Sequence, residues 1–308
     1  MRTVFLGTPA FAVPTLRAMM QAGHQVLLAV TQPDRPRGRG RQLAPPPVKE
    51  AALALGLEVY QPERVRRPEA VETLRALAPE VMVVVGYGQI IPQTVIDIPP
   101  LGIVNVHASL LPKYRGAGPV QWAIVNGETR SGVTTMRIDA GLDTGDMLLR
   151  RETAIGADEN AVELSARLAD MGAALLVETL AALAAGAIVP EKQDSAQATY
   201  APLLKKEDGV IDWSRTAQAI HNQVRGLQPW PGACATFRGQ ALHVWKSRPH
   251  ALAAGPARAP GTVIAVKPLL VACGAGALEL LEVQSEGRKR LPAADFANGQ
   301  RIEQNEHL

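Results

Sequence analysis

The sequence predicts an α/β protein in which a Rossmann-like, doubly wound, mainly parallel sheet is followed by a small C-terminal β-barrel domain. Three observations support this fold class. The chain has 308 residues, about twice the usual length of one domain. Short β-branched runs alternate with helical stretches through the first half, which indicates a parallel sheet. Short apolar runs separated by Gly and Pro fill the last third, which is typical of a small barrel.

Strands and helices alternate in the first half of the chain. Apolar, β-branched runs predict strands at residues 3–6, 25–30, 81–85 and 103–107. Stretches with helical periodicity predict helices at residues 10–22, 48–55, 69–77 and 119–125. A hairpin of residues 133–138 with 147–153 extends the sheet. In open sheets of this kind ligands bind beyond the carboxyl ends of the strands, so we expect the site at the loops 86–91 and 107–118.

A domain boundary is expected after the long helix predicted at residues 161–185. The following stretch is polar with weak periodicity, so we predict a first domain at 1–189, a linker at 190–206 and a second domain at 207–308. Strands of the second domain are predicted at residues 233–237, 242–245, 261–266, 269–273 and 278–283.

The composition is that of a soluble globular protein. Hydrophobic residues make up 47% and charged residues 20%, which excludes a wholly disordered chain. Cys234 and Cys273 are the only cysteines and lack CxxC spacing, which fits a reducing compartment. The start shows no signal-length apolar segment, and Glu178 interrupts the longest apolar tract, 172–189. We expect a cytoplasmic protein with no membrane association, and a monomer by default.

Positive charge is concentrated on two segments. Residues 1–204 carry 19 Lys+Arg against 20 Asp+Glu, a net −1, whereas residues 205–308 carry 13 against 9, a net +4. Within the first part, residues 33–49 hold five cations against Asp34 alone. Two separate basic segments suit a polyanion larger than a small metabolite.

The glycines after the predicted strands carry little information about a ligand. Gly7-Thr8-Pro9-Ala10 lacks the GxGxxG spacing that brings a helix N-terminus to a pyrophosphate, which argues against nucleotide binding. Gly86-Tyr87-Gly88 fits a ligand-contacting backbone and a plain tight loop equally well.

Asn105 and His107 share one face of a predicted strand, because they are two residues apart. An amide that donates a hydrogen bond and an imidazole that binds a developing oxyanion are what an acyl transfer requires. A buried histidine beside a structural asparagine is the alternative interpretation of this pair.

The segment 138–146 is a glycine-rich loop with three aspartates between two predicted strands. A Ca²⁺ loop and ordinary turn chemistry both remain open for such a segment taken alone. Gly141 and Gly145 bracket Asp143, which suits a tight loop that presents one carboxylate. Asp143 could hold His107 in one tautomer or accept a proton from an amine. No His or Cys cluster suggests a transition-metal site, so we predict no metal.

Two motifs together resemble the signature of the formyltetrahydrofolate-dependent formyltransferases. The motifs are Asn105-x-His107-x-Ser109-Leu110-Leu111-Pro112-x-Tyr114-Arg115-Gly116 and Leu142-Asp143-Thr144-Gly145-Asp146-Met147. The resemblance extends over essentially the whole chain. The arginine-rich segment 32–41 and the separate C-terminal domain are similar to the branch of the family that acts on methionyl-tRNA. Ala108 departs from the pattern, since many relatives carry glycine there.

The resemblance implies roles for particular residues. Asn105, His107 and Asp143 would be catalytic, and 10-formyltetrahydrofolate would be the formyl donor, without a metal. The acceptor would be initiator methionyl-tRNA. The folate pocket would be formed by Ser109, Leu110, Leu111, Pro112, Gly86, Tyr87, Gly88, Gln89 and Ile90. The tRNA contacts would come from Arg35, Arg37, Arg39 and Arg41. A solvated surface loop is the alternative interpretation of these arginines.

The second domain would be a barrel like the oligonucleotide-binding fold, which can present cations to phosphates. The candidate cations are Lys205, Lys206, Arg238, Lys246, Arg248, Lys267, Arg288, Lys289 and Arg290. Rival functions are a formyltransferase for a small-molecule amine, a hydrolase that releases formate from formyltetrahydrofolate, and a catalytically idle RNA-binding protein.

Overall fold

The computed structural model describes residues 1–37, 42–251 and 258–308. These residues form two compact units. The first unit comprises residues 1–116, 131–153 and 165–200, and the second comprises 117–130, 154–164 and 201–308. The second unit therefore combines two short internal segments with the C-terminal third of the chain.

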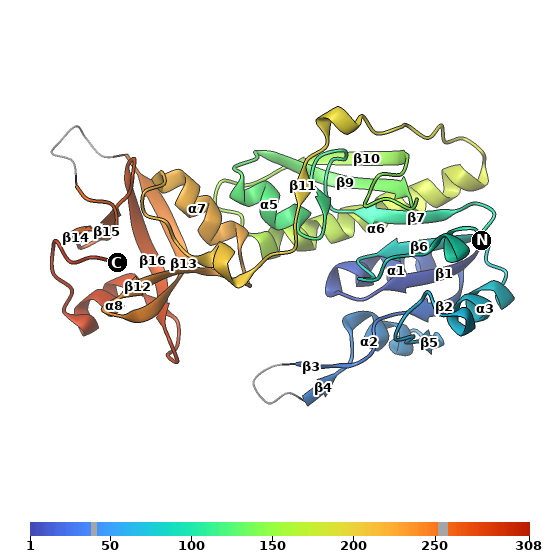
Figure 1. Cartoon of the computed structure of the whole chain (residues 1–308), viewed down its shortest axis with the longest axis horizontal. Helices are drawn as coiled ribbons and strands as arrows, with labels where there is room; N and C mark the ends of the chain where they lie inside the picture. Colours follow the sequence, from blue (N-terminus) through green and yellow to red (C-terminus); the bar gives the residue numbers. More distant parts are fainter. Residues whose placement is uncertain (38–41, 252–257) are drawn as a thin grey trace. The chain divides into compact units, whose positions relative to one another are not determined.

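A seven-stranded sheet is the centre of the first unit, with strand order β10-β9-β7-β6-β1-β2-β5. Its strands are β1 (Arg2–Gly7), β2 (Gln25–Val30), β5 (Val59–Tyr60), β6 (Val81–Val85), β7 (Ile103–His107), β9 (Arg130–Arg137) and β10 (Met147–Ala154). The strands from β5 to β7 pair in parallel, and β9 pairs antiparallel with β7. Figure 1 shows β7, β6, β1 and β2 side by side. The predicted mainly parallel sheet is confirmed.

Helices cover both faces of this sheet. They are η1 (Ala10–Ala12), α1 (Val13–Gln21), α2 (Pro47–Ala54), α3 (Pro68–Ala76), α4 (Gln93–Ile96) and α6 (Ala161–Ala184). One core cluster packs Val104 and Val106 of β7 with residues of α1, α2 and α6. The cluster on the opposite face packs Met82 of β6 and Ile103 of β7 with residues of α3 and α4. Burial on both faces explains why these strands are almost continuously apolar.

Gly172 sets the close approach of α6 to β7. A Cβ at this position would lie 2.7 Å from Cγ1 of Val106. The face of β7 that carries Val106 is therefore filled by a helix. Because side chains alternate along a strand, Asn105 and His107 point to the other face.

The strand order reverses between β1 and β6, since the chain first adds β2 and β5 on one side of β1 and then β6 on the other. At such a reversal the loops after the two strands diverge and leave space for a ligand. The loop 86–91 follows β6 directly, and the loop 108–114 follows the next strand, β7.

Short elements complete the first unit. They are β3 (Arg35–Arg37), β4 (Gln42–Ala44), β8 (Arg115–Gly116), η2 (Ser195–Gln197) and β11 (Tyr200–Ala201). The strands β3 and β4 pair with each other, and β8 pairs with β11. The stretch predicted as a linker is therefore hydrogen-bonded to β8 through part of its length.

The second unit is built on antiparallel strands with order β12-β13-β16-β15-β14, and β17 pairs with β16. Its elements are α5 (Pro119–Val125), η3 (Lys206–Gly209), α7 (Ala217–Gly226), β12 (Ala233–Phe237), β13 (Gln240–His250), β14 (Val263–Val266), β15 (Leu269–Ala272), β16 (Ala277–Ser285), β17 (Leu291–Pro292) and α8 (Ala293–Gln300). The strand β13 carries register shifts near Lys246, and such irregularities bend a strand so that its sheet can curl around a core. The small C-terminal β domain that the sequence predicts is confirmed, and the strands of its sheet pair antiparallel.

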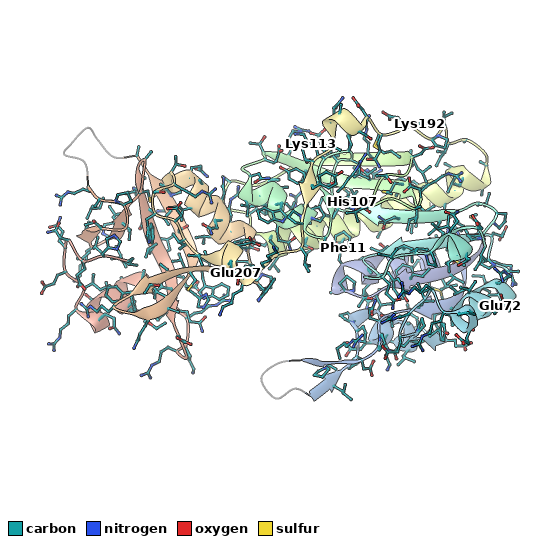
Figure 2. The ribbon with its side chains drawn as sticks, viewed as in Figure 1. Phe11, Glu72, His107, Lys113, Lys192 and Glu207 are labelled. Atoms are coloured by element: carbon teal, nitrogen blue, oxygen red, sulfur yellow. The ribbon has the colours of Figure 1, made fainter. Side chains whose placement is uncertain are left out.

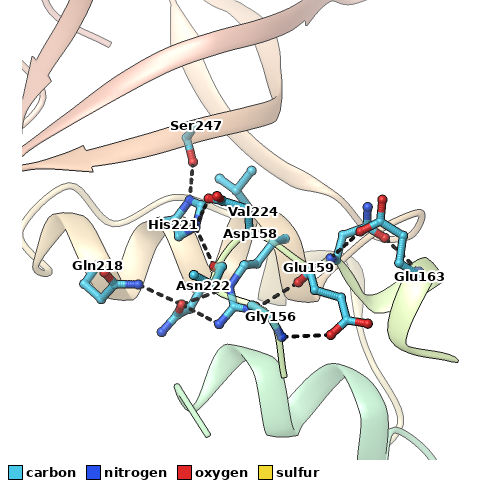
Figure 3. A network of polar contacts seen from close by, with 12 residues as sticks. Gly156, Asp158, Glu159, Glu163, Gln218, His221, Asn222, Val224 and Ser247 are labelled. Atoms are coloured by element: carbon cyan, nitrogen blue, oxygen red, sulfur yellow. Dashed lines mark hydrogen bonds and ion pairs between the residues drawn. The ribbon is translucent and has the colours of Figure 1, made fainter. Parts of the chain in front are cut away.

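Helix α7 buries polar side chains as well as apolar ones. Ile220 and Val224 are fully buried in the core of the second unit. His221, Asn222 and Arg225 are buried too, and they form the network shown in Figure 3. Its members join α7 to the segment 156–163 within the same unit.

Backbone carbonyls satisfy much of this network. The Arg225 guanidinium donates to the carbonyl oxygens of Gly156 (3.2 Å) and Glu159 (3.0 Å) and to Oδ1 of Asn222. His221 contacts Oγ of Ser247 at 3.1 Å. The network thus fixes α7 by hydrogen bonds that the hydrophobic pattern does not reveal.

All four tryptophans belong to the second unit: Trp122, Trp213, Trp230 and Trp245. None of the helices in the described ranges is long and apolar enough to cross a membrane.

Candidate active site

Strand β7 presents Asn105 and His107 on one face, as the sequence predicts (Figure 2 labels His107). Both side chains are buried, with 9% and 6% of their surface exposed. Nε2 of His107 donates to the carbonyl oxygen of Tyr114 at 2.9 Å. Across the described residues, the Asn105 amide makes no hydrogen bond with the protein. A nearly buried amide without a protein partner is available to a ligand.

His107 and Asp143 lie together. Nδ1 of the imidazole is 3.6 Å from Oδ2 of the carboxylate. Both ring nitrogens therefore face acceptors, Tyr114 on one side and Asp143 on the other. A protonated imidazole has a donor for each of these neighbours, whereas a neutral ring has only one donor. The pair suits a site that handles a proton.

The loop 138–146 holds Asp143 in an unusual backbone conformation. Its φ is +50°, in the left-handed region that non-glycine residues rarely adopt. A Cβ at Gly141 would lie 1.9 Å from Oγ1 of Thr144, and a Cβ at Gly145 would lie 2.0 Å from the carbonyl oxygen of Arg137. Both flanking glycines are thus required by close approach, as the predicted tight loop demands.

Asp139 organises the turn instead of facing the candidate site. Its Oδ1 accepts from the backbone N–H of Gly141 at 3.0 Å and from the hydroxyl of Thr144 at 2.7 Å. This is ordinary side-chain-to-backbone turn chemistry. Over the described ranges, no group of three or more His, Cys, Asp or Glu side chains is arranged to hold a metal ion.

The loop after β7 is fixed by its own hydrogen bonds. The Ser109 hydroxyl donates to the carbonyl of Lys113 at 2.6 Å, and Oγ1 of Thr134 donates to the carbonyl of Ser109 at 2.8 Å. Leu111 packs in a small buried cluster. Ser109 and Leu111 are therefore buried, while Leu110 and Pro112 are partly exposed. The assignment of these four residues to a folate pocket stays a prediction.

The five predicted folate residues after β6 occupy different environments. The Tyr87 side chain is 1% exposed and belongs to a core cluster, and burial raises the pKa of its hydroxyl well above the usual range. The Gln89 amide oxygen accepts from the backbone N–H of Val65 at 2.7 Å. Gly86 and Gly88 have φ of +56° and +84°. Ile90 is 89% exposed. If this loop binds a ligand, the glycine backbone and Ile90 are its accessible parts.

The predicted RNA-binding arginines are described in part. Arg35 is 66% exposed and 3.8 Å from the equally exposed Glu63, a weak surface pair. Arg37 is the last residue of β3, but Arg39 and Arg41 lie outside the described residues. Lys49, counted with the basic segment, instead pairs with Asp34 at 2.8 Å. The hydrogen bond from Gln61, followed by that from Lys49, lowers the pKa of Asp34.

Several candidate cations of the second unit pair within the unit. Arg238 contacts both carboxylate oxygens of Glu306 and stacks on Phe237. Arg290 lies over the ring of Trp245 at 3.3 Å. Arg238 therefore has a structural partner, which weakens the case that it binds phosphate.

The sequence patterns do not identify Gln193 as a site residue, because it lies in the stretch that they predict to be a linker. Its side chain contacts the carbonyls of Asp143 and Gly145 and the guanidinium of Arg115. The residues in contact are 48 to 78 positions apart in sequence. The periodicity of a local stretch of sequence does not predict contacts between residues that are so far apart along the chain.

Comparisons with known proteins place the chain in a family. The family model described as "Formyl transferase" matches residues 1–180, and the model of the formyl transferase C-terminal domain matches residues 203–301. The chain belongs to the formyl transferase family. Within this family, the methionyl-tRNA formyltransferase of Solibacter usitatus is 74% identical over 308 residues, which cover all of this chain and 98% of the relative. That of Geobacter sulfurreducens is 50% identical over 310 residues, which cover 100% and 96%.

Solved structures share the formyl transferase fold at low sequence identity. The methionyl-tRNA formyltransferase from Clostridium thermocellum has a TM-score of 0.55 at 17% identity and covers 80% of this chain and 93% of its own. The sugar 3N-formyl transferase WlaRD has a TM-score of 0.66 at 17% identity and covers 94% and 99%. HypX from Aquifex aeolicus, in complex with tetrahydrofolic acid, has a TM-score of 0.63 at 18% identity over 99% of this chain. This chain spans about half of HypX, 48% of its length.

Proposed function

We propose that this formyl transferase moves the formyl group of 10-formyltetrahydrofolate onto the amino group of methionyl initiator tRNA. One observation carries the proposal of formyl transfer: the Asn105 amide has no hydrogen bond to the described protein and shares a strand face with the His107–Asp143 pair. Two bacterial relatives that align with essentially the full chain are named methionyl-tRNA formyltransferases, and these names support methionyl-tRNA as the acceptor.

The reaction exchanges one C–N bond for another. The amine nitrogen of the acceptor attacks the formyl carbon, whose carbonyl oxygen gains negative charge as the carbon becomes tetrahedral. The bond to the donor nitrogen then breaks. One proton leaves the acceptor amine, and one must reach the donor nitrogen. The site therefore has to stabilise an oxyanion and move a proton.

The three residues divide these tasks. The Asn105 amide is the free donor for the oxyanion. A protonated His107 can add a second donor when Nε2 exchanges the Tyr114 carbonyl for the substrate. The Asp143 carboxylate stabilises that positive charge and accepts the amine proton, directly or through one water.

Features of two solved neighbours support a folate donor. HypX is described in complex with tetrahydrofolic acid, and WlaRD in the presence of 5-N-formyl-THF. In this chain, the glycine-rich loop 86–91 follows β6 at the reversal of strand order, where ligands of such sheets bind. We therefore assign the folate to this loop and to the segment 109–112.

Charge distribution supports an RNA acceptor. The arginine segment and the basic last third are two separate positively charged parts of the sequence. Such an arrangement suits a long polyanion. We assign Arg35, Arg37, Arg39 and Arg41 to the tRNA because guanidinium groups match phosphate geometry. We further propose that the enzyme acts in the cytoplasm, where translation occurs, and as a monomer, which sedimentation analysis would test.

The test is a transfer assay with purified protein. Charged initiator tRNA and 10-formyltetrahydrofolate should yield N-formylmethionyl-tRNA, with much slower release of formate in the absence of tRNA. An amino-sugar nucleotide and a purine-precursor amine serve as competing acceptors. Faster transfer to either small amine, or to water, would refute the proposed acceptor while leaving the family assignment intact.

A further inference from the structure

Gln193 makes four hydrogen bonds with the loops that carry the candidate site. Its amide nitrogen donates to the carbonyl oxygens of Asp143 at 2.9 Å and Gly145 at 2.8 Å. Its amide oxygen accepts from Nε and Nη2 of Arg115 at 3.0 and 2.8 Å. One side chain thus joins the loop 138–146 to the strand β8.

Chemistry fixes the orientation of this amide. A guanidinium has only donors, and a backbone carbonyl only accepts. The amide oxygen must therefore face Arg115, and the nitrogen must face the two carbonyls. The reversed amide would lose all four hydrogen bonds, so the side chain has one satisfied arrangement.

The contacts close a ring around Asp143. Arg115 precedes Gly116, whose N–H donates to Oδ2 of Asp143 at 2.8 Å. Gln193 links the Arg115 side chain back to the Asp143 carbonyl. The carboxylate oxygen that lies 3.6 Å from His107 is therefore held from its own backbone and from the backbone of β8.

We infer that Gln193 is a positioning residue that holds the Asp143 carboxylate at its working distance from His107. The inference rests on the proposed function. Asp143 has φ of +50°, in the left-handed region that costs a non-glycine residue free energy, and contacts from outside the loop help to maintain this conformation. A displacement of about 1 Å can reduce an enzymatic rate by about 10²-fold, which gives such contacts a measurable effect.

Two substitutions test the inference. Gln193→Met keeps the length of the side chain and removes every hydrogen bond. Gln193→Glu keeps the acceptor for Arg115 but turns an oxygen toward the two carbonyls. We expect kcat for formyl transfer to fall about 10- to 100-fold in both variants, with KM for either substrate changed by less than about threefold. Gln197→Met is the matched control, since the exposed side chain of Gln197 in the same segment bonds Asp194 alone among the described residues.

A double-mutant cycle with Asp143→Asn separates positioning from a general structural role. If Gln193 acts through the carboxylate, Gln193→Met should change the residual rate of Asp143→Asn by less than about threefold. Calorimetry checks that each protein is folded at the assay temperature, and Gln193→Glu carries the test if Gln193→Met is not.

The outcomes are distinguishable. Full activity of both folded Gln193 variants, or the same fold loss in the Asp143→Asn background as in wild type, would overturn the positioning role. A wild-type protein that transfers no formyl group to charged tRNA would overturn the proposed function itself.

Discussion

At the scale of single residues, Asn105 differs from its polar neighbours because its amide is nearly buried and has no hydrogen-bond partner among the described residues. Asn105→Ala should lower kcat about 10²- to 10³-fold, since the lost donor acts mainly on the transition state. Folate affinity should change little. Single-turnover transfer and direct folate titration measure the two effects, and a near-normal transfer rate would remove Asn105 from the mechanism.

His221 should make the stability of the second unit depend on pH. Burial lowers the pKa of this imidazole, Arg225 lowers it further, and Asp158 and the contacts with Ala157 and Ser247 oppose the shift. The unfolded chain therefore gains a proton near pH 6.5, while the folded protein gains it only at lower pH. The contribution of His221 is complete above pH 6.5 and is lost as pH falls toward the folded pKa.

His221→Gln should consequently lose less stability than wild type between pH 7.5 and 5.5. Urea unfolding followed by tryptophan fluorescence is the suitable measurement, since all four tryptophans report on the second unit. Equal losses in the two proteins would contradict the assignment.

At the scale of elements, the loop 138–146 depends on the absence of side chains at its glycines. Gly145→Ala should destabilise the first unit by about 1 to 3 kcal/mol and lower kcat, because its Cβ would lie 2.0 Å from the Arg137 carbonyl and the loop must move. Calorimetry and the transfer assay provide the measurements. Gly299→Ala in α8 is the control, since the added carbon has no close contact beyond its own helix turn and chain neighbours, and it should be neutral or stabilising.

Elements with a regular apolar pattern could be predicted from the sequence, and others could not. The strands β6 and β7 have the predicted limits because they are buried on both faces and rich in valine. Helix α7 was not predicted. Its residues His221, Asn222 and Arg225 are buried, whereas a periodicity analysis expects such polar residues to be exposed. His221 and Arg225 contact backbone carbonyls of the segment 156–159, which lies more than 60 residues earlier.

The candidate site, like the elements, could be predicted only where a local sequence pattern indicates it. Asn105 and His107 follow from strand geometry, and the tight loop at Asp143 follows from its glycines. The residues alone offer a contact between His107 and Asp143 only as one of two possibilities, because 36 positions of sequence separate them, and the resemblance to a family favours it. Neither a local sequence pattern nor the family motifs pointed to Gln193.

At the scale of the whole molecule, charge should govern tRNA binding. Replacing Arg35, Arg37, Arg39 and Arg41 by Ala should weaken binding of charged initiator tRNA at low salt and flatten its salt dependence, since each phosphate contact contributes a slope of roughly −0.9. Folate binding should not change. The affinities should converge at high salt.

The quadruple Arg→Lys variant is the control for this experiment. It keeps the charge, so it should retain the salt slope while losing part of the affinity that bidentate contacts provide. Filter binding across a salt series gives both quantities. Identical slopes in wild type and the Ala variant would identify the segment as a solvated loop.

The composition of the second unit also has a consequence for synthesis on the ribosome. Residues 117–130 and 154–164 leave the exit tunnel well before residues 201–308, with which they form one unit. Until Arg225 is made, the carbonyls of Gly156 and Glu159 lack the guanidinium that contacts them in the folded unit. At about 5 to 20 residues per second, this interval lasts several seconds. The nascent chain should therefore complete the sheet of the first unit before these two segments are packed in the second unit. In stalled chains of increasing length, protease protection should appear first in the first unit and then in the second.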